Sequence, residues 1–527
     1  MAVRTKILFL GFCAGERSLI QQWAAAGLMP TVQSLLKKGL SGPSISLPGF
    51  FIGSTWESFA TGVTPAKHGI YCWEQLRLGT YEHFRCLTHE NFKTEAFWDV
   101  LSRAGRRVAV LDVPLSPYSK ALNGIQLVEW GAHDAQYGFM TSPPELANEI
   151  VARFGQHPWR GNCDAERESE EFVQFRDDLL AGIATKTKIT KHFLDQGGWD
   201  IFLQVFTESH CIGHQCWHIH DPTHPWHTAD LARTVGDPVQ AVYCAIDRAM
   251  GEILADIEDD TIVVFLAGHG MGPKYQAQFL LDQILLRLGV AAPVQHEVPQ
   301  ESAQSVRWRD RIDPMLGWGW QHLPEGVRKT LKPVHQGMRS WIDGPPKSPK
   351  SPIDPATSLC FRVSNNFAHG GIRINLDGRE PQGKVQRGSE CDTLCAQLEH
   401  DLQEIVNLDT GQPIVHRVLR IADVYHGPYL DYLPDVVVEW SNDAPVYRIG
   451  SKKIGEIHGE YRYCRTGEHH PGGMFIAAGG DILPRKLTHS VSILDFAPTL
   501  SALLGVELSE VDGRVITELT QAVRLPS

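Results

Sequence analysis

Short apolar runs alternate with longer stretches whose apolar residues recur at helical spacing along most of the chain. A short apolar run bounded by turn residues indicates a buried strand, whereas apolar residues three and four positions apart indicate a helix. The predicted strands cover residues 6–11, 107–113, 201–206, 261–267, 436–440 and 474–478. The predicted helices cover residues 18–38, 144–154, 170–196, 238–257, 390–406 and 493–504. This alternation is typical of an α/β fold, with a doubly wound, mostly parallel sheet and helices on both faces.

Two segments interrupt the alternation and define the predicted domain organisation. Residues 291–355 contain four tryptophans and then a stretch rich in Pro, Lys and Ser, which predicts an inserted cap or lid followed by a linker. Residues 356–457 predict a smaller α+β subdomain. The core is then built from residues 1–290 and 458–527.

Composition narrows the classes of function. The 527 residues carry a formal net charge of −12, which argues against a nucleic-acid binder but not against a small anionic substrate. No apolar run reaches the roughly 18 residues that span a bilayer, and the run at 7–10 is too short for a signal peptide. Eleven scattered cysteines do not suggest a disulfide framework. We therefore predict a cytoplasmic protein with a small-molecule substrate. Its sequence is compatible with a homo-oligomer.

Five stretches in a fixed order carry recognisable motifs. They are Ile7–Gly11 with Gly-Leu-Met-Pro at 27–30; Trp-Glu-Ser-Phe-Ala-Thr-Gly at 56–62 with His-Gly-Ile at 68–70; Glu-Ser-His-Cys-Ile-Gly-His at 208–214; Val-Val-Phe-Leu-Ala-Gly-His-Gly-Met-Gly at 263–272; and pieces between 371 and 499 that include Thr-Gly-Glu-His at 466–469. Together they resemble the type I phosphodiesterase/nucleotide pyrophosphatase family of the alkaline phosphatase superfamily. The resemblance implies a site at the carboxyl ends of the strands.

The resemblance also implies two metal ions and a Ser or Thr nucleophile at a helix N-terminus, but this sequence departs from that pattern. The first-strand Asp of the family falls on Cys13, the nucleophile on Ile52 or a neighbour, and the Asp of the family's Ser-Asp-His-Gly on Gly268. Of the metal ligands in that motif, only His269 remains. The second metal site is therefore doubtful.

At the other implied metal site, one ligand type is exchanged and no ligand is lost. His210 stands where the family has an Asp, His214 follows four residues later, and His469 matches the distal ligand. Residues at i and i+4 lie one turn apart on a helix, and three imidazoles with an open fourth position suit zinc. We predict one zinc ion on this triad. Any two of these histidines could instead be a hydrogen-bonded face, and His218 or His470 could replace one member.

Four further residues are candidates for catalysis. Ser54 and Thr55 are either helix N-caps or a nucleophile displaced along the chain. Cys13 is either a small buried residue or a reactive group, and His269 is either structural or a general acid or base.

Three functions are compatible with these residues. The first is a hydrolase or lyase in which one zinc ion supplies hydroxide in place of the missing nucleophile. The second is a phosphodiesterase or nucleotide pyrophosphatase with a relocated nucleophile, and the third is a pseudoenzyme that keeps the fold. We favour the first, because a decaying site would lose its ligands without preserving one triad.

Overall fold

The computed structural model describes residues 6–521 apart from 87–90, 132–137, 160–164, 295–350, 367, 460 and 462–463. Most of the predicted cap or lid, and the linker up to residue 350, therefore lie outside the described residues. The predicted domain boundaries stay a prediction.

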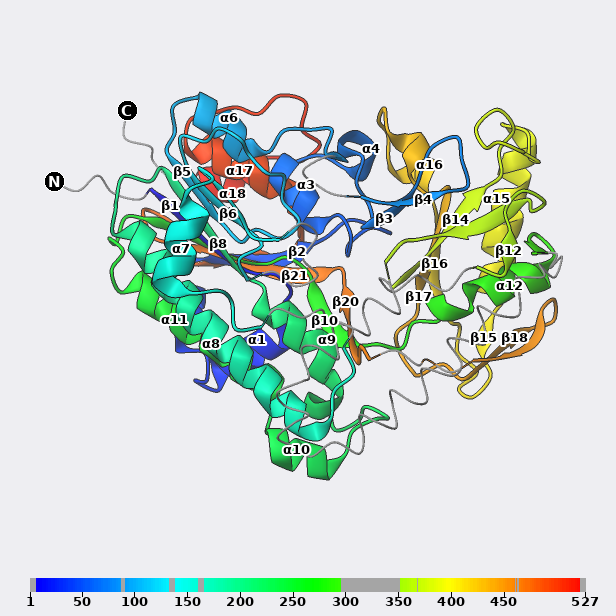
Figure 1. Cartoon of the computed structure of the whole chain (residues 1–527), viewed down its shortest axis with the longest axis horizontal. Coiled ribbons are helices and arrows are strands. Elements are labelled where there is room, and N and C mark those ends of the chain that lie inside the picture. The colour runs from blue at the N-terminus through cyan, green and yellow to red at the C-terminus, as the bar shows by residue number, and fades with distance from the viewer. Residues whose placement is uncertain are drawn as a thin grey trace, which may run out of the picture.

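A ten-stranded sheet forms the centre of the molecule (Figure 1). Its strands, in spatial order, are β22 (Arg485–Lys486), β2 (Leu40–Ile45), β21 (Gly472–Ala478), β9 (Ile262–Ala267), β1 (Ile7–Phe12), β8 (Ile201–Phe206), β5 (Val108–Leu111), β6 (Gly124–Val128) and β7 (Met140–Ser142), with β23 (Val491–Ser492) paired to β2. The five strands from β9 to β6 are mutually parallel, while β21 and β7 run antiparallel to their neighbours. The mostly parallel sheet is confirmed.

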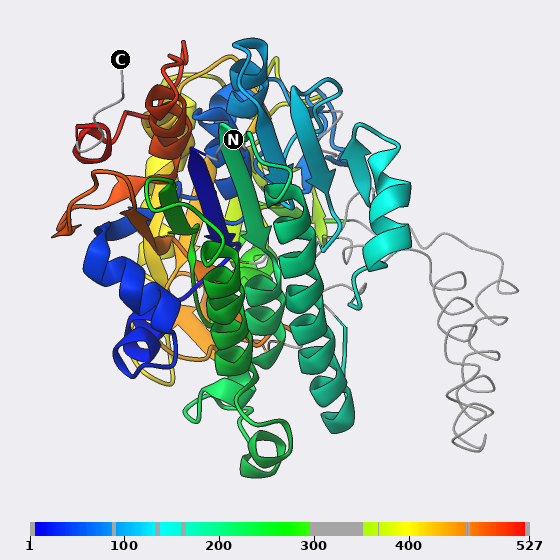
Figure 2. The same ribbon diagram turned by 90° about the vertical axis from the view of Figure 1, so that its left-hand side faces the viewer.

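Helices cover both faces of this sheet because side chains alternate across its strands. In β1, Leu8, Leu10 and Phe12 pack into one apolar cluster, while Ile7 and Phe9 pack into a second cluster on the other face. The first face carries α1 (Arg17–Ala25), α2 (Pro30–Lys38), α7 (Leu146–Phe154), α8 (Ser169–Leu194), α9 (Glu208–His220), α10 (Ala229–Val235) and α11 (Pro238–Leu254) (Figure 2). The second carries α3 (Thr55–Thr61), α4 (Pro65–His68), α6 (Phe97–Arg103), α17 (Phe496–Leu503) and α18 (Thr517–Thr520).

The helix predicted over 18–38 is two helices, α1 and α2. The chain turns between them at Gly27, whose φ of 77° lies in the left-handed region that favours glycine. Pro30 then begins α2, where a missing amide proton costs nothing. The helix predicted over 493–504 likewise begins with a 3₁₀ turn, Ile493–Asp495.

A smaller antiparallel sheet lies beside the central one (Figure 1). Its order is β13 (Cys360–Val363), β14 (His369–Ile374), β17 (Val436–Trp440) and β16 (Val415–Arg420), and it shares an apolar cluster with α12 (Leu281–Leu288) and α15 (Ser389–Gln403). Shorter elements are β3 (Glu74–Leu76), β4 (His83–Arg85), β11 (Ala292–Pro293), β12 (Ile353–Asp354), β15 (Val406–Asn407), β18 (Arg448–Ser451), β19 (Gly455–His458) and α16 (Ile421–Val424). Within the described ranges, no helix is long and apolar enough to cross a membrane.

Candidate metal centre

The candidate site lies where three central strands end. Cys13 follows β1, α9 begins just after β8, and His269 follows β9. The short strand β10 (Gly270–Pro273) then pairs with β20 (Gly467–His470), which places Met271 opposite His469. Parallel strands end at one edge of the sheet, so segments nearly 460 residues apart in sequence meet there.

Three histidines come together at this edge. His210 and His214 lie one turn apart on α9, and His469 reaches them from β20. Their nearest ring nitrogens all lie within 4.8 Å of one another, and all three residues are buried. The Nε2 atoms of His214 and His469 are 3.0 Å apart. Two ligands of a tetrahedral zinc ion lie about 3.3 Å apart, since each Zn–N bond is about 2.0–2.1 Å long.

Backbone carbonyls fix the orientation of two of these rings. Nδ1 of His214 lies 2.7 Å from the carbonyl oxygen of Gly467, and Nδ1 of His469 lies 3.4 Å from that of Gly270. A carbonyl only accepts, which assigns the proton of each ring to Nδ1. The two Nε2 lone pairs then face each other, and a positive group stabilises such a pair. The Arg465 guanidinium lies 3.3 Å from the His214 atom, and a metal ion bound by both atoms would serve the same purpose. The residues therefore fit a metal ion, and the Nδ1 contacts resemble the carbonyl contacts that orient metal-ligating histidines.

The electrostatics keep His469 neutral. Burial, together with the neighbouring His269 and His214, holds the pKa of His469 well below its usual value. Burial alone would raise the pKa of Glu468, but the Lys274 ammonium, 2.6 Å away, lowers it to about 2 with help from His469 and Arg465. A neutral imidazole is the form that binds metal.

Arg465 adds a positive group that sequence reasoning missed. Its side chain is buried, and its Nη1 lies 3.3 Å from Nε2 of His214. The guanidinium stays charged in proteins and pairs with carboxylate or phosphate. The only signal in the sequence was its position four residues before His469.

Two predicted catalytic candidates lie beside the triad. The ring of His269 is 4.0 Å from that of His469, centre to centre. The Cys13 sulfur lies 3.9 Å from Nδ1 of His210, and the residue is buried. Both side chains are therefore close enough to act at the same centre.

The alternative ligands are used elsewhere. Nδ1 of His218 lies 3.0 Å from the Thr466 hydroxyl, and Nε2 of His470 lies 2.5 Å from the Glu16 carboxylate. Among the described residues, the metal-like group of side chains consists of His210, His214 and His469 alone.

Ser54 and Thr55 are held by other groups. The Ser54 hydroxyl donates to the carbonyl of Ile70 at 3.0 Å, and the Thr55 hydroxyl donates to the carbonyl of Phe51. Ser54 also lies 3.2 Å from Nε2 of His68. Nδ1 of that imidazole accepts the amide proton of Ile70, so Nε2 carries the proton and cannot take one from Ser54. Ser54 occupies the N-cap position of α3 but makes no side-chain capping bond.

Trp56 packs against Gly268 and Cys13, the positions where the resemblance implies ligands of a second metal. A Cβ on Gly268 would lie 3.2 Å from the Trp56 ring, and one on Gly11 would lie 3.3 Å from it. The indole nitrogen donates to the Cys13 carbonyl at 3.3 Å. A carboxylate on residue 268 therefore has no room unless the indole moves. Sequence reasoning located Gly268 and Cys13 but missed the role of Trp56.

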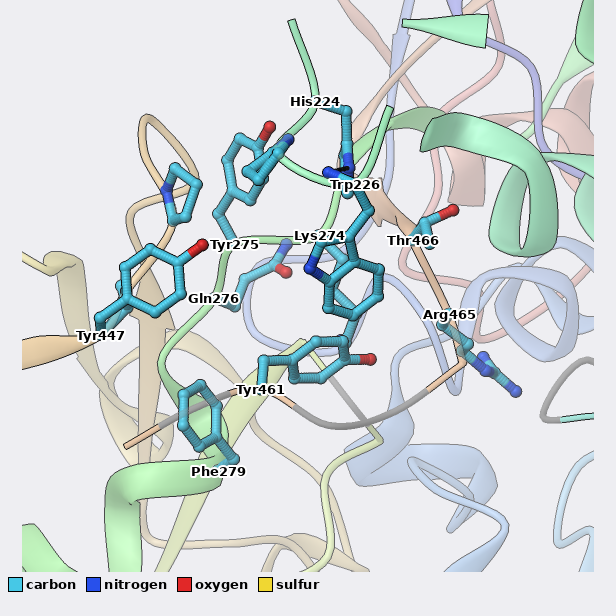
Figure 3. Close-up of a pocket in the computed structure, with 13 residues that line it drawn as sticks. His224, Trp226, Lys274, Tyr275, Gln276, Phe279, Tyr447, Tyr461, Arg465 and Thr466 are labelled. Carbon is cyan, nitrogen blue, oxygen red and sulfur yellow. Dashed lines mark hydrogen bonds between the residues drawn. The ribbon is translucent and has the colours of Figure 1, made fainter. Parts of the chain in front are cut away.

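An aromatic cavity of ≈ 80 Å³ lies at the far end of the β10–β20 pair (Figure 3). Its rings belong to His224, Trp226, Tyr275, Phe279, Tyr447 and Tyr461. The cavity is also lined by the polar residues Lys274, Gln276, Arg465 and Thr466. Figure 3 shows the Arg465 guanidinium pointing away from the rings.

Comparisons with known proteins show the family and the fold of the chain. The family model described as "Type I phosphodiesterase / nucleotide pyrophosphatase" matches residues 11–325. The fold is similar to that of phosphonoacetate hydrolase from Sinorhizobium meliloti 1021 in complex with phosphonoformate, with a TM-score of 0.50, 15% identity and 95% of each chain covered. It is also similar to a mutant of the alkaline phosphatase PafA, with a TM-score of 0.51, 12% identity and coverage of 98% of this chain and 99% of that one. A search of curated proteins found no match.

Proposed function

This chain belongs to the type I phosphodiesterase/nucleotide pyrophosphatase family, and we propose that it is a hydrolase that works with one metal ion, most simply zinc. His210, His214 and His469 would hold the ion. The observation that carries this proposal is the pair of buried Nε2 atoms, 3.0 Å apart, whose Nδ1 atoms both face backbone carbonyls. A zinc ion on three imidazoles lowers the pKa of bound water to about 7 and so provides a nucleophile at neutral pH.

A single ion is favoured over a pair because Trp56 occupies the neighbouring space. The resemblance assigns acidic ligands of a second ion to Cys13 and Gly268, and neither offers a carboxylate. The indole lies against Gly268 and bonds to the Cys13 backbone. The site is thus less anionic and more apolar than a two-metal site.

The protein's own residues supply the remaining chemistry. His269, whose ring is 4.0 Å from that of His469, would carry a proton to the leaving group or from the attacking water. Arg465 would face the negative charge that develops on the substrate, because its guanidinium already reaches His214. Ser54 is poorly placed as a nucleophile, since His68 cannot act as its base. We therefore propose no covalent intermediate on the enzyme.

The alternative function is a phosphodiesterase with a relocated nucleophile, and the two functions predict different activities. With one metal and no hydroxyl nucleophile, hydrolysis of generic phosphate mono- and diesters should be weak. Rapid turnover of an aryl phosphodiester that is lost in Ser54→Ala or Thr55→Ala would favour the alternative.

Elemental analysis of the purified protein tests the proposal. We expect about one zinc per chain, and hydrolytic activity that disappears with chelation and returns with zinc. A stoichiometry near two would contradict the single-ion site. No retained metal after zinc supplementation would favour the pseudoenzyme.

A further inference from the structure

The aromatic cavity joins the metal centre through the β10–β20 pair. The amide of Lys274 donates to the carbonyl of Thr466 at 2.9 Å, which extends the ladder into the cavity wall. On its other side Thr466 contacts α9, where its amide donates to the carbonyl of His214 at 2.7 Å. His469 lies three positions after Thr466, or about 10 Å along the strand at 3.3 Å per residue. The cavity wall and the triad are therefore about 10 Å apart along the strand, a span of several covalent bonds.

The walls favour a planar ring. Trp226 and Tyr461 lie nearly parallel, with an interplanar angle of 18°, and the ring of Phe279 lies 5.9 Å from that of Tyr461. Trp226 is 40% exposed and can adjust to a guest. The volume of ≈ 80 Å³ is far below the roughly 300 Å³ or more of a site that encloses a drug-sized molecule, so the cavity suits one small ring.

The charges disfavour an ionic guest. Lys274 is paired with Glu468 at 2.6 Å and lies 5.3 Å from the centre of the Tyr461 ring. A cation would meet this ammonium, and the wall residues within the described ranges include no carboxylate. An anion would have to compete with Glu468 for the same ammonium. An uncharged ring meets neither difficulty.

Gln276 provides a buried hydrogen-bond acceptor in the cavity wall. The residue is only 6% exposed, and in the described part of the chain its Oε1 makes no hydrogen bond. Its amide points toward Trp226 and the middle of the group of rings (Figure 3). An unsatisfied buried acceptor destabilises the protein, and a ligand with a donor group would relieve that cost.

We propose that this cavity binds an uncharged planar ring that carries an N–H or O–H donor, with Gln276 accepting the hydrogen bond and Trp226 and Tyr461 contacting the ring. That the ring is part of the substrate rests on the proposed function. The ring would then sit several bonds from the bond that is cleaved, because the cavity lies about 10 Å along the strands from His469.

The test uses the full-length protein stripped of metal, so it does not depend on catalysis. Phenol and anisole are titrated by ligand-observed NMR, because they share a ring and differ in the donor. We expect phenol to bind about 2-fold to 12-fold more tightly than anisole, as one net hydrogen bond implies. Gln276→Leu should remove this difference, and Trp226→Ala should weaken both ligands.

Matched variants and a folding check make the result decisive. Trp73→Ala and Gln412→Leu replace exposed residues outside the cavity and should leave both affinities unchanged. Urea midpoints confirm that each variant is folded, and Gln276→Met replaces Gln276→Leu should the latter misfold. Equal affinity for the two ligands, or a phenol preference that survives the loss of Gln276, overturns the inference. Ring binding by a protein that never retains zinc would overturn the proposed function alone.

Discussion

The two halves of the candidate site differ in what fills them. Around His210, His214 and His469, nitrogen ligands converge and backbone carbonyls orient two of the rings. Around Gly268, an indole lies against the position where the resemblance implies an acidic ligand. The first half keeps polar atoms in a metal-like arrangement, while the second is packed like a protein core. This contrast favours conversion to single-metal chemistry over general decay of the site.

Removal of one ligand should have the largest effect on the first half. We expect His214→Ala to lower zinc affinity by more than about 100-fold, since even residues that only orient ligands are worth 10- to 100-fold. Zinc retained after dialysis measures this loss. His458→Ala, which changes an exposed histidine, is the control and should keep its zinc. Unchanged zinc in His214→Ala would show that the triad is not the metal shell.

The boundary between the halves can be probed at His269. We expect His269→Ala to lower the rate by a factor on the order of 10² to 10⁴, typical of a missing acid or base, with zinc content unchanged. Cys13→Ala and Ser54→Ala should keep most of the activity. Steady-state rates with any substrate that the zinc protein turns over provide the measurement. A dead Cys13→Ala variant whose wild-type thiol is trapped by substrate would show covalent catalysis instead.

Restoring a carboxylate in the second half should destabilise the fold. We expect Gly268→Asp to lower the free energy of unfolding by about 3 kcal/mol, because the new side chain meets Trp56 at 3.2 Å and is buried without a partner. Adding Trp56→Ala should recover part of that loss, which a double-mutant cycle in urea would show.

A control for this substitution lies on the neighbouring strand. A Cβ at Gly272 would have its nearest atom at 3.8 Å, so Gly272→Asp should cost less than Gly268→Asp. Equal costs at the two positions would mean that Trp56 does not fill the second half.

The pH dependence of stability should reveal that the helix carrying Trp56 is packed like a protein core. Burial lowers the pKa of His68, which contacts Ser54, from 6.5 to about 3. Between these values the unfolded chain binds a proton that the folded chain does not. Stability present above pH 6.5 is therefore lost as the pH falls toward 3, by up to about 1.4 kcal/mol per pH unit from this group.

His68→Gln should reduce that slope between pH 6 and pH 4, as measured by urea unfolding at each pH. His458→Gln changes an exposed side chain and should leave the slope as in the wild type. A wild-type slope in His68→Gln would show that His68 is not held neutral.

The sequence was sufficient where the deciding signal was local. The apolar run at 201–206 coincides with β8, and the spacing of His210 and His214 placed both on one face of α9. Arg373, Arg379 and Glu380 lie close together in the sequence and pair locally, with Arg373 2.7 Å from Glu380. Strand alternation, helical spacing and motif order can be recognised in the sequence without knowledge of distant contacts.

Only the tertiary structure decided what lies between distant segments. Trp56 meets Gly268 across more than 200 residues, and Arg465 reaches His214 across a similar separation. The rings of the aromatic cavity come from the segment after α9, from the segment after β10, and from residues 447 and 461. The periodicity of one segment does not predict such contacts. Each contact forms only because the sheet brings a distant part of the chain to that place.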